Sequence, residues 1–289
     1  MAQQLQSVVE ETLGVDSQYR IPDALWERIR PLIPPHVKKT RRGRPRMDDR
    51  KAMNAIFYVN GTGCQWKALP HSLGKKSTVH DRFQEWRKAG VFESMWKESL
   101  LDYDETKGIE WEWQSMDTAM TKAPLGGKST GPNPTDRAKS GTKRSILVDG
   151  YGIPIGLAVS GANRHDDIKL AEPTLESIPI EKPEPTTEDP QNLSLAKALD
   201  KGYDFPQIDQ LVEEWGYTGH IARRGVDQSK RKKIPGYRAR RWVVERTHSR
   251  MNRFRRLLIR WEEKKKNYVA MLQFACAWIT WRSAGVSGR

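Results

Sequence analysis

The sequence predicts a mixed α/β protein in which a small helical unit precedes a larger unit built on a mixed sheet. Apolar residues recur at helical spacing up to Gly108, and strict alternation begins at Ile109. The pattern that follows reads β-β-β-α-β-α-β before a long helix. Elements in this order form a mixed sheet with helices on its faces. We therefore expect a flexible arm at 1–20, a helical domain at 21–108 and an α/β domain at 109–289.

The charge balance indicates a polyanionic partner. The 289 residues carry a formal net charge of +14, and each phosphate that a cation neutralises releases counterions, so nucleic acid is the first candidate partner. A membrane surface is the second, but no basic block flanks a long apolar segment. The start lacks the order of an export signal, so we expect a cytoplasmic protein. Two cysteines, Cys64 and Cys276, cannot form a disulfide framework or a zinc site.

A basic segment separates the first two predicted helices. The first helix starts at Pro22-Asp23 and stops at Pro34-Pro35. The segment from Lys38 to Arg46 reads K-K-T-R-R-G-R-P-R, in which Gly-Arg-Pro offers a narrow, extended backbone. That shape suits an A·T-rich minor groove, although a solvated basic linker explains it equally well. The residues that would contact DNA are Arg42, Arg44 and Arg46.

The next two predicted helices fit a DNA-reading pair. Asp48 caps a helix that ends at Asn60-Gly61, and Ser77 begins another whose apolar face leaves Arg82 outside. This fits a helix-turn-helix whose second helix enters a major groove, although the joining segment is longer than a tight turn. We therefore interpret 21–108 as a helical DNA-binding domain. Its candidate contacts are Lys75, Lys76, Ser77, Thr78 and Arg82.

Two aspartates are predicted at the ends of strands. The alternating strand from Ile109 delivers Asp117 at its far end, and a short apolar strand at 195–199 ends at Asp200. In open α/β sheets, strand ends are where sites assemble. Between them a hairpin is predicted from the runs 144–149 and 153–160, and we interpret Asp149 as its turn residue. Asp166 and Asp167 are interpreted as the start of a helix.

A long arginine-rich helix is predicted from Arg238 to Trp261. Its apolar stripe comprises Val244, Thr247, Met251, Phe254, Leu258 and Trp261. Its polar edge comprises Arg241, Glu245, His248 or Ser249, Asn252 and Arg256. A lone glutamate among cations is ordinarily a solvated ion-pair partner. With Asp117 and Asp200, however, Glu245 completes three carboxylates of the kind that Mg²⁺ prefers, and two such ions about 4 Å apart can drive phosphodiester chemistry.

An ordered series of motifs resembles the DDE transposases of bacterial insertion sequences, specifically the insertion-sequence family five group. The motifs are L-W-E-R-I-R-P-L-I-P-P, G-R-P-R, M-D-T, G-P-N-P-T-D-R-A-K-S-G-T-K-R, V-D-G-Y-G-I-P, A-N-R-H-D, D-K-G-Y-D and R-W-V-V-E-R-T-H-S-R-M-N-R-F-R-R-L. The resemblance covers about Ile21 to Trp281. It implies a ribonuclease-H-like catalytic domain, Mg²⁺ dependence with Mn²⁺ as a substitute, and cleavage and strand transfer at terminal inverted repeats.

The resemblance assigns roles to individual residues. Asp117, Asp200 and Glu245 are the implied catalytic residues and the implied ligands of two ions. Arg241 takes the family's arginine position, four residues before the glutamate. The remaining DNA-contact candidates in the second domain are Arg137, Lys143, His248, Asn252, Arg253 and Arg256. The expected partners are double-stranded DNA, both element ends and target, and further copies of the chain in a dimer or larger assembly.

The chain departs from the family pattern Tyr-x2-Arg-x3-Glu-x6-Lys in two slots. Arg238 stands in the tyrosine slot and Asn252 in the lysine slot. A role for that lysine in gripping the terminal phosphate is therefore in doubt, and Arg253, Arg255 or Arg256 can substitute. Only a short basic segment, 224–236, separates the last strand from the glutamate helix. A β-rich insertion is thus not predicted, and a hairpin-forming route is not supported.

Other interpretations remain open from the sequence alone. The chain could be a helix-turn-helix regulator with an inactive catalytic half, or a nuclease that cuts without joining. His165 and His248 are more often hydrogen-bonding surface groups than catalytic ones at such positions. The eleven tryptophans are expected mostly in the core, with one or two free to stack on an unpaired base.

Overall fold

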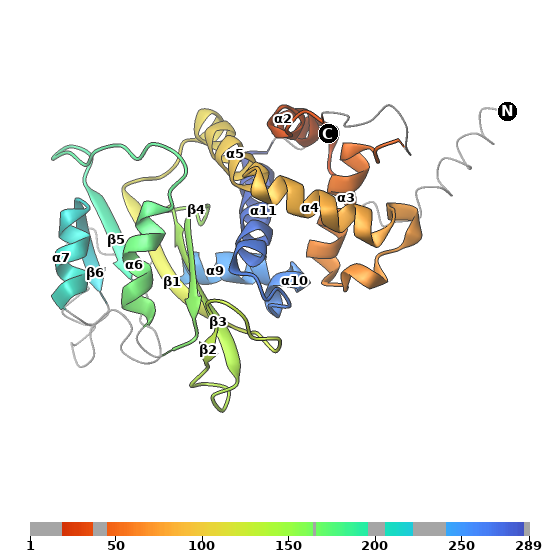
Figure 1. The fold of residues 1–289 in the computed structure, drawn as a ribbon. Coiled ribbons are helices and arrows are strands. Elements are labelled where there is room, and N and C mark those ends of the chain that lie inside the picture. The colour runs from red at the N-terminus through yellow and green to blue at the C-terminus, as the bar shows by residue number, and fades with distance from the viewer. Residues whose placement is uncertain (1–18, 37–44, 164–165, 196–205, 222–240, 286–289) are drawn as a thin grey trace.

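The structure is a computed structural model, and it describes residues 19–36, 45–163, 166–195, 206–221 and 241–285. Figure 1 shows the sheet and its covering helices on one side of the molecule, with α2 to α4 on the other and α11 between them. None of the described helices is long and apolar enough to cross a bilayer. The arm expected at 1–20 lies almost wholly outside the described residues.

The amino-terminal part is helical, as predicted. Asp48 caps α3 by accepting a hydrogen bond from the Lys51 amide, and Gly63 ends that helix in the left-handed conformation. Two short 3₁₀ turns fill the long connection to α4, and Gly108 ends α5. The elements are α2 (Asp23–Ile29), η2 (Arg30–Leu32), α3 (Asp49–Thr62), η3 (Trp66–Ala68), η4 (His71–Leu73), α4 (Lys76–Lys88) and α5 (Val91–Lys107).

The sheet is mixed, as predicted. Its strands are β1 (Trp113–Lys122), β2 (Gly131–Pro132), β3 (Ser140–Val148), β4 (Pro154–Gly161), β5 (Gln191–Leu195) and β6 (Tyr217–Ile221). Strand β3 lies between β1 and β4 and is antiparallel to both, while β1, β5 and β6 follow one another in parallel. The short β2 pairs with the start of β3. The predicted hairpin is confirmed as β3 and β4.

Helices cover both faces of this sheet. Helix α9 (Arg241–Asn252) packs on β1 and β3, and α6 (Asp166–Glu176) packs on β3 and β4 from the other side. The two faces follow from alternation along β3, because Arg144 hydrogen-bonds to α9 whereas Leu147 lies beside Gly156, which contacts α6. Helix α7 (Pro206–Glu214) packs on β6.

The first strand differs from its prediction. We expected it to start at Ile109 and to end at Asp117, but β1 begins at Trp113 and continues to Lys122. The backbone amides of Ile109, Glu110 and Trp113 donate to the side chains of Asp104, Asp149 and Glu110 rather than to a neighbouring strand. Strand β3 then pairs with β1 as far as Lys122. Asp117 therefore lies in the middle of a strand, where it pairs with Ile146 of β3.

The arginine-rich helix also differs from its prediction. We expected one helix from Arg238 to Trp261, but α9 ends at Asn252 and a short α10 (Arg255–Leu258) follows. Phe254 has an extended backbone, which interrupts the hydrogen-bond pattern of the helix. As a result Leu258 and Trp261 are exposed rather than on the buried stripe, and Arg256 and Arg260 point inward. Of the apolar strand predicted at 195–199, only Leu195 is described. It is the last residue of β5, which starts at Gln191, and residues 196–199 lie outside the described residues.

Helix α11 (Lys265–Ala284) belongs to the core of both parts of the chain. It is buried nearly all round, and its main packing partner is α5. It also contacts β4, α4 and α9. The helix-based boundary at 108 thus falls between elements that share one continuous core, and the division into two domains stays a prediction.

Asp149 is the turn residue that the sequence predicted. Its carboxylate accepts hydrogen bonds from the backbone amides of Tyr151 and Ile153 and, on the other oxygen, from Glu110. Burial raises the pKa of this carboxyl to about 6, although the three backbone hydrogen bonds oppose the shift. The folded chain therefore holds a proton here at pH values where the unfolded chain has lost it.

Asp149 should make the protein less stable as the pH rises. Below the usual aspartate pKa of 3.8 the group is protonated in both states, and its contribution to stability is lost as the pH rises through about 6. Carbon-13 NMR of the Asp149 carboxyl should give a titration midpoint near pH 6. A midpoint near 3.8 would contradict the assignment.

Arg260 fixes the chain after α10 to the sheet. Its side chain is 1% exposed and donates to the carbonyl oxygens of Lys128, Ser129, Glu262 and Glu263. It also donates to the Thr142 hydroxyl and lies over the Tyr268 ring. The Arg260 amide in turn bonds to the Lys122 carbonyl at the end of β1.

Replacing this guanidinium should be costly. Arg260→Met keeps the aliphatic stem but leaves several buried carbonyl oxygens without a donor, so we expect a loss of about 3 kcal/mol or more in the free energy of unfolding. Urea unfolding followed by circular dichroism measures it. Arg255→Gln, at an exposed neighbour, should stay within about 0.5 kcal/mol. A loss below about 1 kcal/mol in Arg260→Met would mean that water replaces the guanidinium.

Candidate active site

The site is built on the face of the sheet that α9 covers. In the antiparallel pairing of β1 and β3, Asp117 lies opposite Ile146 and Ala119 lies opposite Arg144. Paired residues point to the same face, as do residues two apart in a strand, so Asp117 and Arg144 share a face. Both are buried, with Asp117 9% exposed.

Helix α9 carries Glu245 to this face. The Nε2 atom of His248 lies 4.0 Å from Oδ2 of Asp117, and Glu245 stands one helical turn before His248, about 4.5 Å along the axis. Glu245 is exposed. The helix is anchored by Thr247, whose hydroxyl donates to the Gly152 carbonyl, and by Arg246, which donates to that of Tyr151. The structure therefore brings two of the three predicted carboxylates to one region.

The third carboxylate, Asp200, lies outside the described residues. Within the described ranges no three His, Cys, Asp or Glu side chains form a group that could hold a metal ion. The pairing of β5 with β1 is nevertheless informative, because Leu195 lies opposite Met116. The last described residue of β5, Leu195, is thus paired with the neighbour of Asp117.

His248 is a neutral, buried residue, contrary to the surface position that we expected. Burial lowers the pKa of its imidazole to about 3, and the positive charge of Arg144 adds to the shift. Its approach to Asp117 is therefore not an ion pair. The side chain is 7% exposed, and it fills the space between α9 and the strand that carries Asp117.

Arg144 is a residue of this site that the sequence reading missed. Its Nη2 atom donates to Oδ1 of Asn252 at 2.6 Å and to the His248 carbonyl at 3.4 Å. The guanidinium is 1% exposed. A cation at an inward position of an apolar strand needs partners, because an unpaired buried charge is costly. That signal was present in the run R-S-I-L-V, but only the register of β3 shows which way Arg144 points.

Two family models match the chain. Residues 21–96 match "Putative transposase of IS4/5 family", and residues 110–280, more than half of the chain, match "Transposase DDE domain". The chain is a DDE transposase of the IS4/5 family. It is an enzyme that acts on DNA, as the sequence motifs implied. The expected mixed α/β fold preceded by helices is confirmed by the sheet and the helical amino-terminal part.

Relatives from insertion sequences support the same membership. The transposase is 34% identical over 158 residues to "Putative transposase for insertion sequence element IS402" of Burkholderia cepacia, which covers 55% of this chain and 71% of the relative. It is 30% identical over 118 residues to "Insertion element IS402 uncharacterized 16.2 kDa protein" of the same organism, with coverages of 39% and 80%.

One of the solved structures that the chain matches is "Crystal structure of a pre-cleavage Mos1 transpososome". It is 12% identical, the alignment covers 88% of the transposase and 83% of that chain, and the TM-score is 0.25. A score this low supports no inference about the transposase.

Some of the amino-terminal DNA-contact candidates are exposed, and others are already engaged in ion pairs within the protein. Lys75, Lys76 and Ser77 are exposed and Thr78 is half-buried at the start of α4, as predicted. The expectation that Arg82 lies outside is wrong, because its buried guanidinium pairs with Asp49 and donates to the Met47 carbonyl. Arg46 forms a two-pronged ion pair with Glu85. Arg42 and Arg44 lie outside the described residues.

The candidates in the second part divide in the same way. Arg137 and Arg253 are exposed, and Arg241 begins α9. Lys143 is buried on the face of the sheet opposite Asp117, since it is adjacent to Arg144 in β3. Arg256 is also buried, because it pairs with Glu262 and donates to the Cys64 carbonyl. Lys143 and Arg256 are therefore wrong as DNA-contact candidates, and Asn252 is held by Arg144.

One exposed tryptophan stands beside the site. Trp242 is 57% exposed, one helical turn before Glu245, and the Arg246 guanidinium lies 4.9 Å from its ring centroid. The sequence could not say which tryptophan is free to stack, and the structure leaves this one with an open face. Trp86 and Trp96, by contrast, are fully buried.

Removing Arg144 should loosen α9. In Arg144→Met we expect a loss of about 1–3 kcal/mol in the free energy of unfolding, since the charge-assisted hydrogen bonds to α9 are gone. Hydrogen exchange with mass spectrometry should show faster exchange in α9, while α6 on the other face keeps its protection. Arg144→Lys keeps the positive charge but loses the several N–H donors of the guanidinium, so its loss of stability should be intermediate. Equal loss of protection in α6 and α9 would contradict a local role.

Proposed function

We propose that this transposase binds the terminal inverted repeats of an insertion sequence and catalyses divalent-metal-dependent DNA cleavage and strand transfer. The observation that carries the proposal is the meeting of Asp117, in the middle of β1, with the helix that presents Glu245. The register of β5 beside β1 supports adding Asp200, because the chain leaves Leu195 next to Met116.

The donor chemistry fits magnesium. Asp117, Asp200 and Glu245 supply carboxylate oxygens, which are hard ligands suited to Mg²⁺, and Mn²⁺ accepts the same set. Two such ions would activate the attacking water or 3′-hydroxyl and stabilise the leaving oxygen. Glu245 is exposed on α9, so a DNA backbone can approach it without displacing core side chains.

The surrounding residues position the carboxylates. Strand β3 pairs with Asp117, and β5 pairs with β1 up to the neighbouring Met116. Arg144 ties α9 to the sheet through Asn252 and the His248 carbonyl. Since the His248 imidazole is neutral, it adds no positive charge that would compete with a bound cation at Asp117.

DNA binding would use exposed cations at both ends of the molecule. Lys75 and Lys76 precede or open α4, whose amino-terminal amides favour phosphate. Arg137 and Arg253 are exposed in the second part. Transposition requires that two element ends are brought together, so we expect a homodimer or larger assembly on DNA.

Loss of any one carboxylate should abolish the chemistry and spare DNA binding. We expect Asp117→Asn, Asp200→Asn and Glu245→Gln to cut and join at least about 100-fold more slowly, because each removes a metal ligand. The substrate is labelled DNA that ends in the inverted repeats flanking the gene, with Mg²⁺ or Mn²⁺. Gel shift should give affinities within about twofold of the unmodified chain, because the phosphate contacts remain.

Glu213→Gln, at an exposed position on α7, is the matched control and should keep full activity. Retained cleavage in any carboxylate variant would show that the residue is misassigned. Cleavage without joined products in the unmodified protein would identify a nuclease, and a gel shift without cleavage would identify a regulator. Either outcome would overturn strand transfer.

A further inference from the structure

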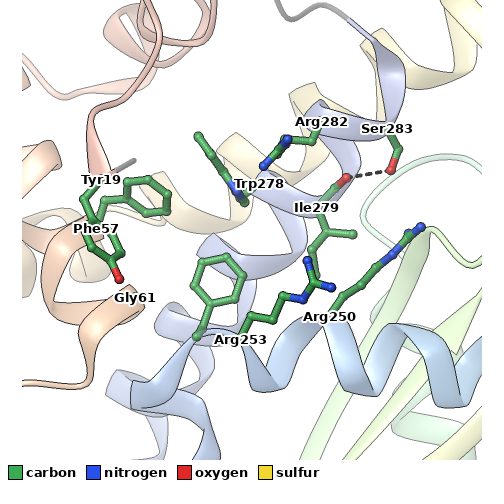
Figure 2. A pocket seen from close by; sticks show the side chains of 10 residues that line it. Tyr19, Phe57, Gly61, Arg250, Arg253, Trp278, Ile279, Arg282 and Ser283 are labelled. Atoms are coloured by element: carbon green, nitrogen blue, oxygen red, sulfur yellow. Dashed lines mark hydrogen bonds between the residues drawn. The ribbon is translucent and has the colours of Figure 1, made fainter. Parts of the chain in front are cut away.

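A cavity lies where the amino-terminal helices meet the end of α9 and the last turns of α11. Its volume is about 470 Å³, within the range of roughly 300–1,000 Å³ that is usual for small-molecule sites. Figure 2 shows Tyr19 and Phe57 on one side, Trp278 and Arg282 from α11 above, and Arg250 and Arg253 from the end of α9 below. Elements distant in sequence therefore build one site.

Aromatic rings form one wall of this cavity. The Phe57 and Trp278 ring centroids are 4.4 Å apart, and Tyr19 packs edge-on against Phe57 at 6.1 Å. Phe57 is buried, whereas Tyr19 and Trp278 are half-buried and keep surface toward the cavity. Such a wall offers a flat, polarisable surface on which a planar ring can stack.

Three arginines also border the cavity, with Arg282 one helical turn beyond Trp278 on α11 and Arg250 and Arg253 across from that helix. The described residues that line the cavity include no aspartate or glutamate. None of the three forms an ion pair with another described residue, and Nη1 of Arg250 is buried without a hydrogen-bond partner among them. Burial lowers the pKa of Arg250, and the charges of Arg246 and Arg253 lower it further, while the charges of Asp149 and Tyr103 oppose the shift. Gathering like charges is unfavourable unless an anion joins them.

We propose that this cavity binds an unpaired nucleotide of a DNA strand, with the base against Trp278 and its phosphate among the three arginines. The combination selects this occupant, because guanidinium groups match phosphate oxygens and aromatic rings stack on bases without regard to sequence. Inorganic phosphate would use the arginines alone and leave the aromatic wall uncovered. The proposal deepens the proposed function, on which it rests, by naming a second contact to the DNA.

The position of the cavity agrees with this role. Arg253 follows Glu245 by eight residues, which is about 12 Å along a helix axis. Nucleotides of one strand are about 3.4 Å apart along duplex DNA. A strand cut beside Glu245 would therefore place a nucleotide about three or four positions away near the arginines, at a distance where an end of the duplex can open.

The test compares a duplex that carries a short single-stranded overhang with the same duplex made blunt. Fluorescence anisotropy is measured in EDTA, so that the result does not depend on cleavage. The native chain should prefer the overhang. Arg282→Gln should weaken overhang binding about tenfold and blunt binding by less than about twofold, since only the overhang fills the cavity. Trp278→Leu should weaken overhang binding about fivefold or more.

Arg30→Gln removes the same charge from an exposed site outside the cavity and should affect both duplexes equally and slightly. Thermal unfolding checks that each variant is folded, and Arg282, being exposed, is the variant least able to disturb the core. Equal affinity of the native chain for both duplexes, or equal weakening of both by Arg282→Gln, overturns the cavity alone. Failure to bind either duplex overturns the proposed function as well. Full competition by a free deoxynucleoside monophosphate at the concentration of the overhang would show that the cavity takes free nucleotides rather than DNA.

Discussion

A guanidinium buried between a strand and a helix is the constraint from which the active-site geometry follows. Arg144 cannot reach water, so its partners must come from the element above it, and that element is α9. Asn252 and the His248 carbonyl accept hydrogen bonds from Arg144, and these two bonds fix the orientation of α9 and its distance from the sheet. Glu245 then stands one turn away from a histidine that touches Asp117. Burial beside this cation also keeps His248 neutral.

Several other arginines of this chain are structural rather than available to DNA. Arg82 pairs with Asp49 and so links α4 to the start of α3. Arg256 donates a hydrogen bond to the Cys64 carbonyl and so links α10 to the loop after α3. Arg260 donates to the carbonyl oxygens of Lys128 and Ser129. The 50 lysines and arginines therefore overstate the cations available to DNA, because some of them are buried in contacts within the fold. Exposed cations in the described part of the chain include Lys75 and Lys76 at the start of α4 and Arg253 and Arg255 after α9.

Local signals predicted local structure well. The cap at Asp48, the hairpin around Asp149 and the helix stop at Pro34 each depend on a few neighbouring residues, and all are present. The burial of Arg82 depends on Asp49 and Met47, which are distant in the chain and which no periodicity reveals. The site shows the same division. Motifs identified Asp117 and Glu245, but only the pairing of β1 with β3 brought Arg144 beneath them.

The packing of α11 against α5 has a consequence for synthesis on the ribosome. Helix α5 is synthesised before the whole sheet, whereas α11, the helix that covers it, is synthesised after the sheet. Until then its apolar side is open, and the amino-terminal helices lack a large share of their core. Contacts between such distant segments slow folding. The amino-terminal helices can therefore complete their core only after α11 has been translated.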